Sequence, residues 1–281
     1  MSNRRTFLQS AASLPFLIQT AKSQAASSDP LLQAKKEPVL KLNSFPSPII
    51  IDSIELFRTN NEFFVKTTST DGAVGVSITN NRASYLYPIL DRLVIPHFQG
   101  KDARDLESLI DSVYLFKNNY KIAGLALWCP VAWVEMSILD MLGQIANKPV
   151  GELFGGIIRR EIPIYCASGN RHTSPQDEAK ILANLVEKTG AKAVKFKVGG
   201  RMSKDTDSIP GRSEALIPLA RQTLGDDIAI HADSNGSYGV KKAIEIGKRL
   251  QDINAIFFEE PCEFDHLEET KQVADALKIP V

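Results

Sequence analysis

The sequence has few cysteines and no net charge, and each shortage excludes a class of site. Only three of its 281 residues are cysteine. They lie far apart and lack the CxxC spacing of a zinc site, so we interpret them as small buried apolar side chains. Lysine plus arginine and aspartate plus glutamate number 33 each, which gives a formal net charge of zero. A broad nucleic-acid-binding surface is therefore not expected.

The first 26 residues lack an apolar run long enough to span a bilayer, and they have the order of a targeting sequence. A twin arginine, Arg4-Arg5, precedes a short apolar stretch and an alanine-rich exit. This order is typical of a secretory signal peptide, and the paired arginines favour the twin-arginine route. We predict a signal peptide over 1–26, a linker over 27–47, and export to the periplasm without a stable membrane anchor. A tail with a chance arginine pair is the alternative.

The region 48–160 has the pattern of an α+β domain. A hairpin signal at Asp71-Gly72 joins runs rich in strand-forming residues, which predicts a small antiparallel sheet. The predicted strands are 49–57, 62–68 and 73–78. Apolar residues at helical spacing then predict three helices, at 83–93, 103–117 and 130–146, with Pro130 near the start of the last.

The region 161–281 alternates short apolar strands with helices, which predicts βα units on a parallel sheet. The predicted strands are 162–168, 193–199, 228–234 and 255–260, and a fifth begins at 279. The predicted helices are 176–189, 213–224, 239–251 and 265–277. Both a doubly wound sheet and an interrupted (βα)₈ barrel fit this order. The first βα turn has no G-x-G-x-x-G, so a dinucleotide site is not supported.

Two lysines lie on the strand at 193–199. Lys195 and Lys197 are two residues apart and therefore point to one side of the sheet, and the flanking Val194, Phe196 and Val198 point to the other side, toward covering helices. Two ammonium groups inside a barrel require carboxylates or an anionic substrate as partners. Crowding is expected to lower the lysine pKa and to make one of them a usable base. Two exposed lysines on an edge strand are the less favoured alternative.

Acidic and amide side chains end the next two strands. Asp233 and Asn235 follow the strand at 228–234, and Glu259-Glu260 end the strand at 255–260. Barrel active sites lie at the carboxyl ends of the strands, and oxygen ligands suit a hard cation such as Mg²⁺. Each pair alone could be a turn or a solvated acidic pair. Lysine, carboxylate and amide side chains at the ends of three successive strands favour a barrel with a metal site.

These motifs carry a family resemblance. Lys195-Phe196-Lys197, Asp233-Ser234-Asn235-Gly236 and Phe258-Glu259-Glu260-Pro261 resemble the successive strand motifs of the enolase superfamily, in its mandelate racemase and muconate lactonizing branch. The segment Gly151-Glu152-Leu153-Phe154-Gly155-Gly156 resembles the family's entry into the barrel. The resemblance implies a capping domain at 48–160 and, at 161–281, about the first four units of a (βα)₈-type barrel.

The resemblance also implies a role for each motif residue. Lys197 corresponds to the base that takes the α-proton, and Lys195 to its partner, which also holds the substrate carboxylate. Asp233 and Glu259 correspond to two of three Mg²⁺ ligands. Asn235 corresponds to a supporting group at the rim, and Glu260 to a residue behind the ligands. The implied reaction is Mg²⁺-dependent removal of the proton α to a carboxylate, a pattern that is itself a standard example for this superfamily.

The sequence departs from the family pattern in two places. The third metal ligand and the opposite acid or base would lie beyond Val281, so we expect a weakly active or inactive, incomplete barrel. The loop at 200–212 is long, and we favour a solvated loop there. Contact of Arg201, Lys204 or Arg212 with an acidic substrate is the alternative.

Three functions stay open at this point. The first is racemisation, epimerisation, cycloisomerisation or dehydration of a small carboxylate substrate. The second is a Schiff-base barrel lyase that uses Lys197. The third is an exported, non-catalytic binding remnant on the same scaffold. A homo-oligomer is also open, because relatives often form symmetric assemblies. None of the four histidines is assigned to catalysis, and His231 is expected to pack against a helix.

Overall fold

The structure is a computed structural model that describes residues 38–60 and 62–281. The chain divides into two compact units with a boundary between Ile158 and Arg159. The predicted signal peptide over 1–26 lies outside the described residues, so export stays a prediction. Leu40 and Phe45 fall within the predicted linker, yet both are buried in the core of the first unit.

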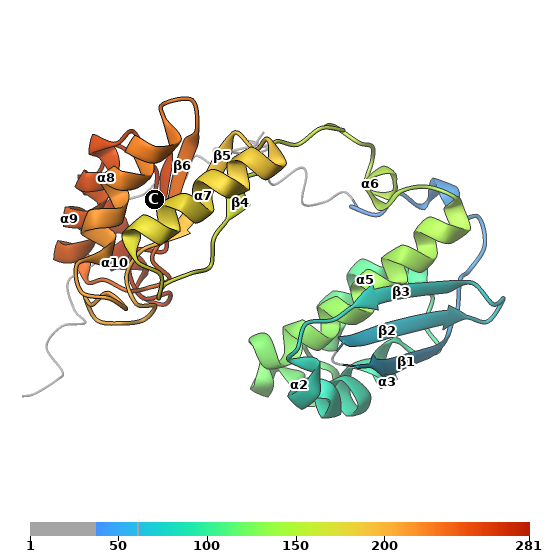
Figure 1. Cartoon of the computed structure of the whole chain (residues 1–281). Helices are drawn as coiled ribbons and strands as arrows, with labels where there is room; N and C mark the ends of the chain where they lie inside the picture. The colour runs from blue at the N-terminus through green and yellow to red at the C-terminus, as the bar shows by residue number, and fades with distance from the viewer. Residues whose placement is uncertain (1–37, 61) are drawn as a thin grey trace, which may run out of the picture. The chain divides into compact units, whose positions relative to one another are not determined.

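The first unit is a three-stranded antiparallel sheet in the order β1-β2-β3, with helices on one face (Figure 1). Its strands are β1 Ile51–Thr59, β2 Glu62–Ser69 and β3 Val74–Ile78. Its helices are α2 Ala83–Ile89, α3 Ile95–Phe98, α4 Leu106–Val113, α5 Leu125–Ala146 and α6 Val150–Leu153. Shorter or irregular turns are η1 Leu42–Ser44, the π-helical η2 Leu90–Val94, η3 Ala103–Asp105 and η4 Phe116–Ile122.

Helix α5 is the centre of this unit and begins five residues before the predicted start. Pro130 therefore lies inside the helix, and the predicted position near its start is wrong. The helix is long and apolar enough to cross a membrane, but just over half of its most apolar stretch is buried inside its own unit. It packs across the sheet, where Val134, Ile138 and Leu142 are fully buried. These are the properties of a core helix.

Gly75 on β3 lies directly against α5. A Cβ atom at this position would clash with the backbone of Ser137 and Met141 and would lie 2.7 Å from the Met141 Cβ. We expect Gly75→Ala to lower the free energy of unfolding by about 1–3 kcal/mol, because backbone atoms cannot move aside as a side chain can. Val76→Thr, at a 45% exposed neighbour on the same strand, should stay within about 0.5 kcal/mol of the parent.

Tryptophan fluorescence during urea denaturation measures this effect in the right unit. The sequence holds two tryptophans, Trp128 and Trp133, and both lie in α5. An unchanged midpoint for Gly75→Ala would contradict the tight approach of β3 and α5.

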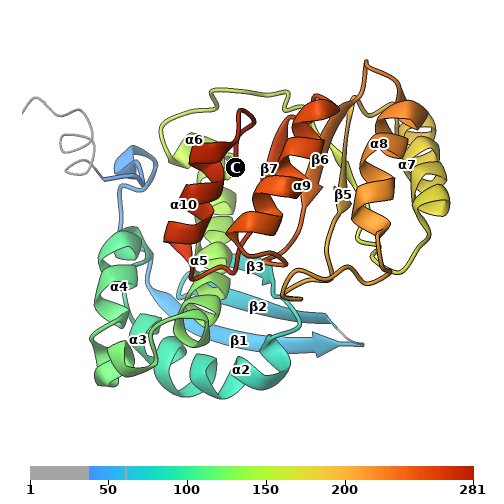
Figure 2. The same cartoon turned by 90° about the vertical axis from the view of Figure 1, so that its left-hand side faces the viewer.

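The second unit is a four-stranded parallel sheet in the order β4-β5-β6-β7. Helices α7 to α10 cover one face of it (Figure 2). Its strands are β4 Cys166–Ala167, β5 Ala193–Lys197, β6 Ala229–Asp233 and β7 Phe257–Glu259. Its helices are α7 Pro175–Thr189, α8 Arg212–Leu224, α9 Val240–Asp252 and α10 Leu267–Ala276. Sequence order and spatial order agree, as in the first half of a barrel sheet.

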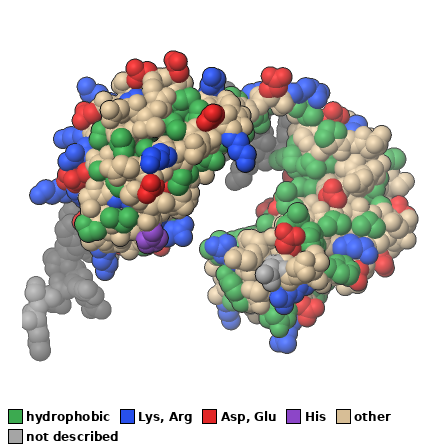
Figure 3. Space-filling model, in the orientation of Figure 1, with side chains coloured by type: hydrophobic (Ala, Val, Ile, Leu, Met, Phe, Trp, Pro, Cys, Tyr) green, Lys and Arg blue, Asp and Glu red, His purple; other side chains and the backbone are tan. Residues whose placement is uncertain are grey.

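The apolar side chains that alternate with the two lysines build the core under the helices. Val194, Phe196 and Val198 are fully buried among apolar residues of α7, α8 and α9. The opposite face of β5 carries Lys195 and Lys197, as the period of two predicts. On the side drawn in Figure 3, basic and acidic side chains are interspersed over both units.

Two predicted strands differ in the structure. The strand expected over 162–168 is formed only at Cys166 and Ala167, which pair with Val194 and Lys195 of β5, and the Ser168 amide donates to the Lys195 carbonyl at 2.8 Å. The strand expected from 279 onwards is not formed. The carbonyl of Pro280 nevertheless accepts a hydrogen bond of 2.9 Å from the Phe258 amide, so this segment lies beside β7.

Candidate active site

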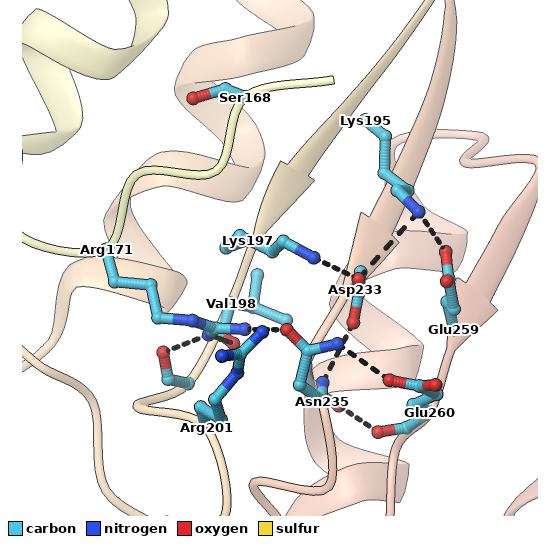
Figure 4. A network of polar contacts seen from close by, with 12 residues as sticks. Ser168, Arg171, Lys195, Lys197, Val198, Arg201, Asp233, Asn235, Glu259 and Glu260 are labelled. Carbon is cyan, nitrogen blue, oxygen red and sulfur yellow. Dashed lines mark hydrogen bonds and ion pairs between the residues drawn. The ribbon is translucent and has the colours of Figure 1, made fainter. Parts of the chain in front are cut away.

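The predicted site residues meet at the carboxyl ends of β5, β6 and β7. In the parallel register Lys197 lies opposite Asp233, and Asp233 lies opposite Glu259. The three side chains therefore form one row across neighbouring strands, with Lys195 one step below on the same face. Figure 4 shows the four side chains converging above the sheet.

The two lysines and two carboxylates neutralise each other. Lys197 Nζ donates to Asp233 Oδ2, and Lys195 Nζ donates to Glu259 Oε2 at 2.5 Å. Lys195 Nζ also lies 3.8 Å from Asp233 Oδ2. Asp233 is only 1% exposed. A buried charge of this kind is tolerated only when it is paired and hydrogen-bonded, which both lysines accomplish.

A third carboxylate joins this group. Asp233, Glu259 and Glu260 each offer one oxygen, and these oxygens lie within 4.8 Å of one another. Convergent carboxylate oxygens on strand ends are a suitable donor set for Mg²⁺. The sequence predicted Glu260 as a supporting residue, and the structure places one of its oxygens in the same cluster as the two predicted ligands.

Asn235 connects the cluster to the neighbouring loops. Its backbone amide donates to Asp233 Oδ1 at 2.9 Å, and its Nδ2 donates to Glu260 Oε2 at 2.7 Å. Asn235 and Glu260 both have positive φ angles, of 46° and 49°. Non-glycine residues in this conformation are uncommon, and they collect at functional sites.

The pKa of Lys195 is shifted in the direction opposite to our expectation. Burial lowers the pKa of Lys195, but hydrogen bonds to Glu259 and Tyr165, together with the charge of Glu259, outweigh burial and raise it above the usual value. The expectation that crowding lowers the lysine pKa is wrong for Lys195. The cause is the carboxylate partner, which the strand register supplies.

His231 also differs from our expectation. It lies two residues before Asp233 on β6 and therefore on the same face, not against a helix. Its ring stacks on Phe257 with centroids 4.2 Å apart and lies 5.4 Å from the Tyr165 ring. Burial lowers the pKa of His231, and the charge of Lys195 lowers it further. Tyr165 and His231 thus form the apolar wall beside Lys195.

Two arginines have positions that the sequence pattern did not reveal. Arg171, in the loop after β4, donates from Nη2 to Asn235 Oδ1 at 2.5 Å. The one available signal was its place directly after the first barrel strand, at the same rim. Arg212 is 2% exposed and donates to the backbone carbonyls of Lys197 and Thr173, both at 2.8 Å. The alternative that Arg212 contacts a substrate is therefore wrong, because its guanidinium is buried and donates to backbone carbonyls of the fold.

Comparison with known proteins shows which family the chain resembles. The model of the family described as "Enolase C-terminal domain-like" matches residues 177–281. A solved structure from Roseobacter denitrificans, classed provisionally as a racemase, superposes with a TM-score of 0.77 at 36% identity. That alignment covers 82% of this chain and 63% of the solved one. Residues 177–281 thus match the enolase family model, and the chain is similar to solved structures of the mandelate racemase and muconate lactonizing branch of the enolase superfamily. The predicted fold class is confirmed.

Other relatives add detail on this branch of the superfamily. A mandelate racemase/muconate lactonizing protein from Paracoccus denitrificans, solved in complex with magnesium, is 26% identical with a TM-score of 0.74. The alignment with this protein covers 82% of our chain and 64% of the solved one. Arabinonate dehydratase of Saccharolobus solfataricus is 27% identical over 76% of this chain and 56% of its own length. L-talarate/galactarate dehydratase of Salmonella typhimurium is 25% identical over 76% and 52%. The chain thus spans about half the length of these curated relatives.

Proposed function

We propose that this chain acts on a small acid, using Mg²⁺ as cofactor, and removes the proton from the carbon next to a carboxylate. The observation that carries the proposal is the convergence of Lys195 and Lys197 with the carboxylates of Asp233, Glu259 and Glu260. The named relatives include dehydratases of sugar acids, which favours dehydration of a sugar acid. Racemisation, epimerisation and cycloisomerisation begin with the same proton removal.

The residues fit a magnesium ion. Asp233 and Glu259, which already pair with the two ammonium groups, would hold it together with Glu260, and one oxygen from each of the three carboxylates lies within 4.8 Å of the others. When bound, Mg²⁺ would stabilise the negative charge that develops on the carboxylate oxygens of the substrate.

The chain's own residues provide the other functions. Lys197 Nζ faces the rim beside Asp233 and takes the α-proton. Lys195 Nζ donates to a carboxylate oxygen of the substrate, and the aromatic ring of Tyr165, 5.1 Å from this nitrogen, limits its movement. The Asn235 amide fixes the Asp233 carboxylate in place. Lys197 as the base and Lys195 as its partner lie on the same strand, β5, so the backbone fixes the distance between them.

Magnesium titration with Asp233→Asn tests this proposal. Asparagine keeps the shape but removes the charge of a buried ligand. Mutation of a residue that only supports a metal ligand typically lowers metal affinity about 10–100-fold. Because Asp233 is a proposed ligand itself, we expect Asp233→Asn to lower the Mg²⁺ affinity by at least this factor. Isothermal titration calorimetry measures it, and Asp226→Asn, exposed at the other end of β6, is the matched control.

The reaction itself is followed by deuterium incorporation. The chain is incubated in D₂O with sugar acids, and the α-position is observed by NMR. Exchange that requires Mg²⁺ and is lost with Asp233→Asn supports the proposal. Equal Mg²⁺ affinity of the parent and Asp233→Asn would overturn the assignment of the metal site.

A further inference from the structure

A hollow of about 600 Å³ lies next to the acidic cluster, over the carboxyl ends of β4 and β5. Its basic lining residues are Arg171, His172, Lys197 and Arg201, and we call it the basic hollow. None of the residues that line it is acidic. Lys197 is paired with Asp233, but the two arginines bring positive charge into a concave site whose lining has no carboxylate, and this arrangement suits an anion.

Arg171 is oriented by acceptors that carry no charge. Its Nη1 donates to the carbonyls of Val198 and Gly199 at 2.6 and 2.7 Å, and its Nη2 donates to the Asn235 carboxamide. Among the described residues no carboxylate lies within 4.0 Å of its guanidinium. The guanidinium is thus held firmly while its charge is not neutralised by a direct ion pair.

Arg201 brings a second guanidinium to the same place. Burial lowers the pKa of Arg171, the charge of Asp233 opposes this lowering, and the nearby charge of Arg201 adds to it, so the two arginines repel each other. Both stay protonated, because an arginine does not lose its proton in proteins. In Figure 4 the two side chains meet beside Asn235. Within residues 38–60 and 62–281 the Arg201 side chain has no hydrogen bond or ion pair.

The backbone of Arg201 is fixed although its side chain is exposed. Its φ angle is 66°, and its amide donates to Ser237 Oγ at 2.8 Å. The next amide, of Met202, donates to the Asn235 carbonyl at 3.0 Å. This loop is therefore attached to the segment that follows β6, and the position from which Arg201 reaches into the hollow is preset.

The hollow and the acidic cluster are close enough for one small molecule. The Asn235 carboxamide contacts Arg171 through its oxygen and Glu260 through its nitrogen, so a single amide group separates them. Lys197 belongs to both regions, because it pairs with Asp233 and lines the hollow. A substrate with its reacting carboxylate at the cluster and its α-carbon over Lys197 therefore extends its other end into the basic hollow.

We infer that the basic hollow binds a second anionic group of the substrate, so that the preferred substrate is a sugar acid with two negative ends. Arginine pairs recognise carboxylate and phosphate by the same bidentate hydrogen bonds, so the second group is a carboxylate or a phosphate. This inference rests on the proposed function, since the acidic cluster defines the first end.

Matched pairs of acids test the inference. Galactarate and galactonate differ only at the carbon far from the reacting carboxylate, and 6-phosphogluconate and gluconate form the phosphate pair. Calorimetry with Mg²⁺ should show that at least one of the acids with two anionic ends binds the chain about 10–100-fold more tightly than its partner with one. The pair with the larger ratio identifies the second group.

Arg201→Met should abolish that preference without affecting the fold, because the side chain is exposed. The control is Lys204→Met, a lysine of the same loop that does not line the hollow. Equal affinities within both pairs, no binding of any of the four acids, or a preference that survives in Arg201→Met would overturn the inference. An Arg201-dependent preference without Mg²⁺-dependent α-exchange would instead retain the hollow as an anion site and reject the proposed function.

Discussion

Replacing Lys197 with methionine is expected to reduce Mg²⁺-dependent α-proton exchange by about 10²–10⁴-fold, the usual contribution of a positioned general base. Methionine keeps most of the side-chain volume but has no nitrogen to accept the proton. Asp233 retains Lys195 at 3.8 Å and the Asn235 amide at 2.9 Å as partners, so the acidic cluster should persist.

The measurement is the rate of deuterium incorporation, with calorimetry on the same preparation for Mg²⁺ affinity. The control is Lys180→Met, at an exposed lysine of α7, which should exchange at the parent rate. Exchange at an undiminished rate in Lys197→Met would mean that another group removes the proton. Loss of Mg²⁺ binding in parallel would mean that Lys197 acts on the site's structure.

Arg212→Met is expected to destabilise the second unit by about 3–5 kcal/mol, the cost of breaking a buried charge pair by removal of one partner. Arg212 Nη2 lies 3.7 Å from Glu178 Oε2, and the Glu178 side chain is completely buried. The variant leaves this carboxylate without its cation. It also leaves the carbonyls of Lys197, Thr173 and Asn170 without a donor.

Hydrogen exchange measured on peptides from β5 and α8 reports this effect in the affected unit. Adding Glu178→Gln to Arg212→Met should recover part of the lost stability, because it removes the unpaired charge. Arg249→Met is the control, since Arg249 is exposed and its ion pairs contribute little. If the free energy of unfolding of Arg212→Met stays within about 0.5 kcal/mol of the parent, the prediction is contradicted, because the buried Arg212–Glu178 pair then contributes no more than a surface residue.

Local periodicity determined most of the fold and much of the site. Apolar residues that repeat every two positions predicted the strands, and those that repeat about every 3.6 positions predicted the helices. These patterns identified all four βα units of the second region, and the predicted ends of the elements lie within a few residues of the observed ends. The same period placed Lys195 and Lys197 on one face, and strand ends placed Asp233 and Glu259 at one rim. It also places His231 on that face, so the different expectation for this residue came from applying the period wrongly.

The tertiary structure decided which long polar side chains face the site and which support the fold. Arg171, Arg201 and Arg212 are alike in sequence, since the first two lie in polar loops at the same rim and Arg212 directly follows such a loop at the start of α8. Their roles depend on acceptors that are distant in the chain: Asn235 for Arg171, and Glu178 with three carbonyls for Arg212. Likewise the pKa of Lys195 is raised by Glu259, which is 64 residues away in sequence. Sequence periodicity specifies which face a residue occupies, whereas hydrogen bonds and charge pairs between distant segments arise only when the strands are aligned in register.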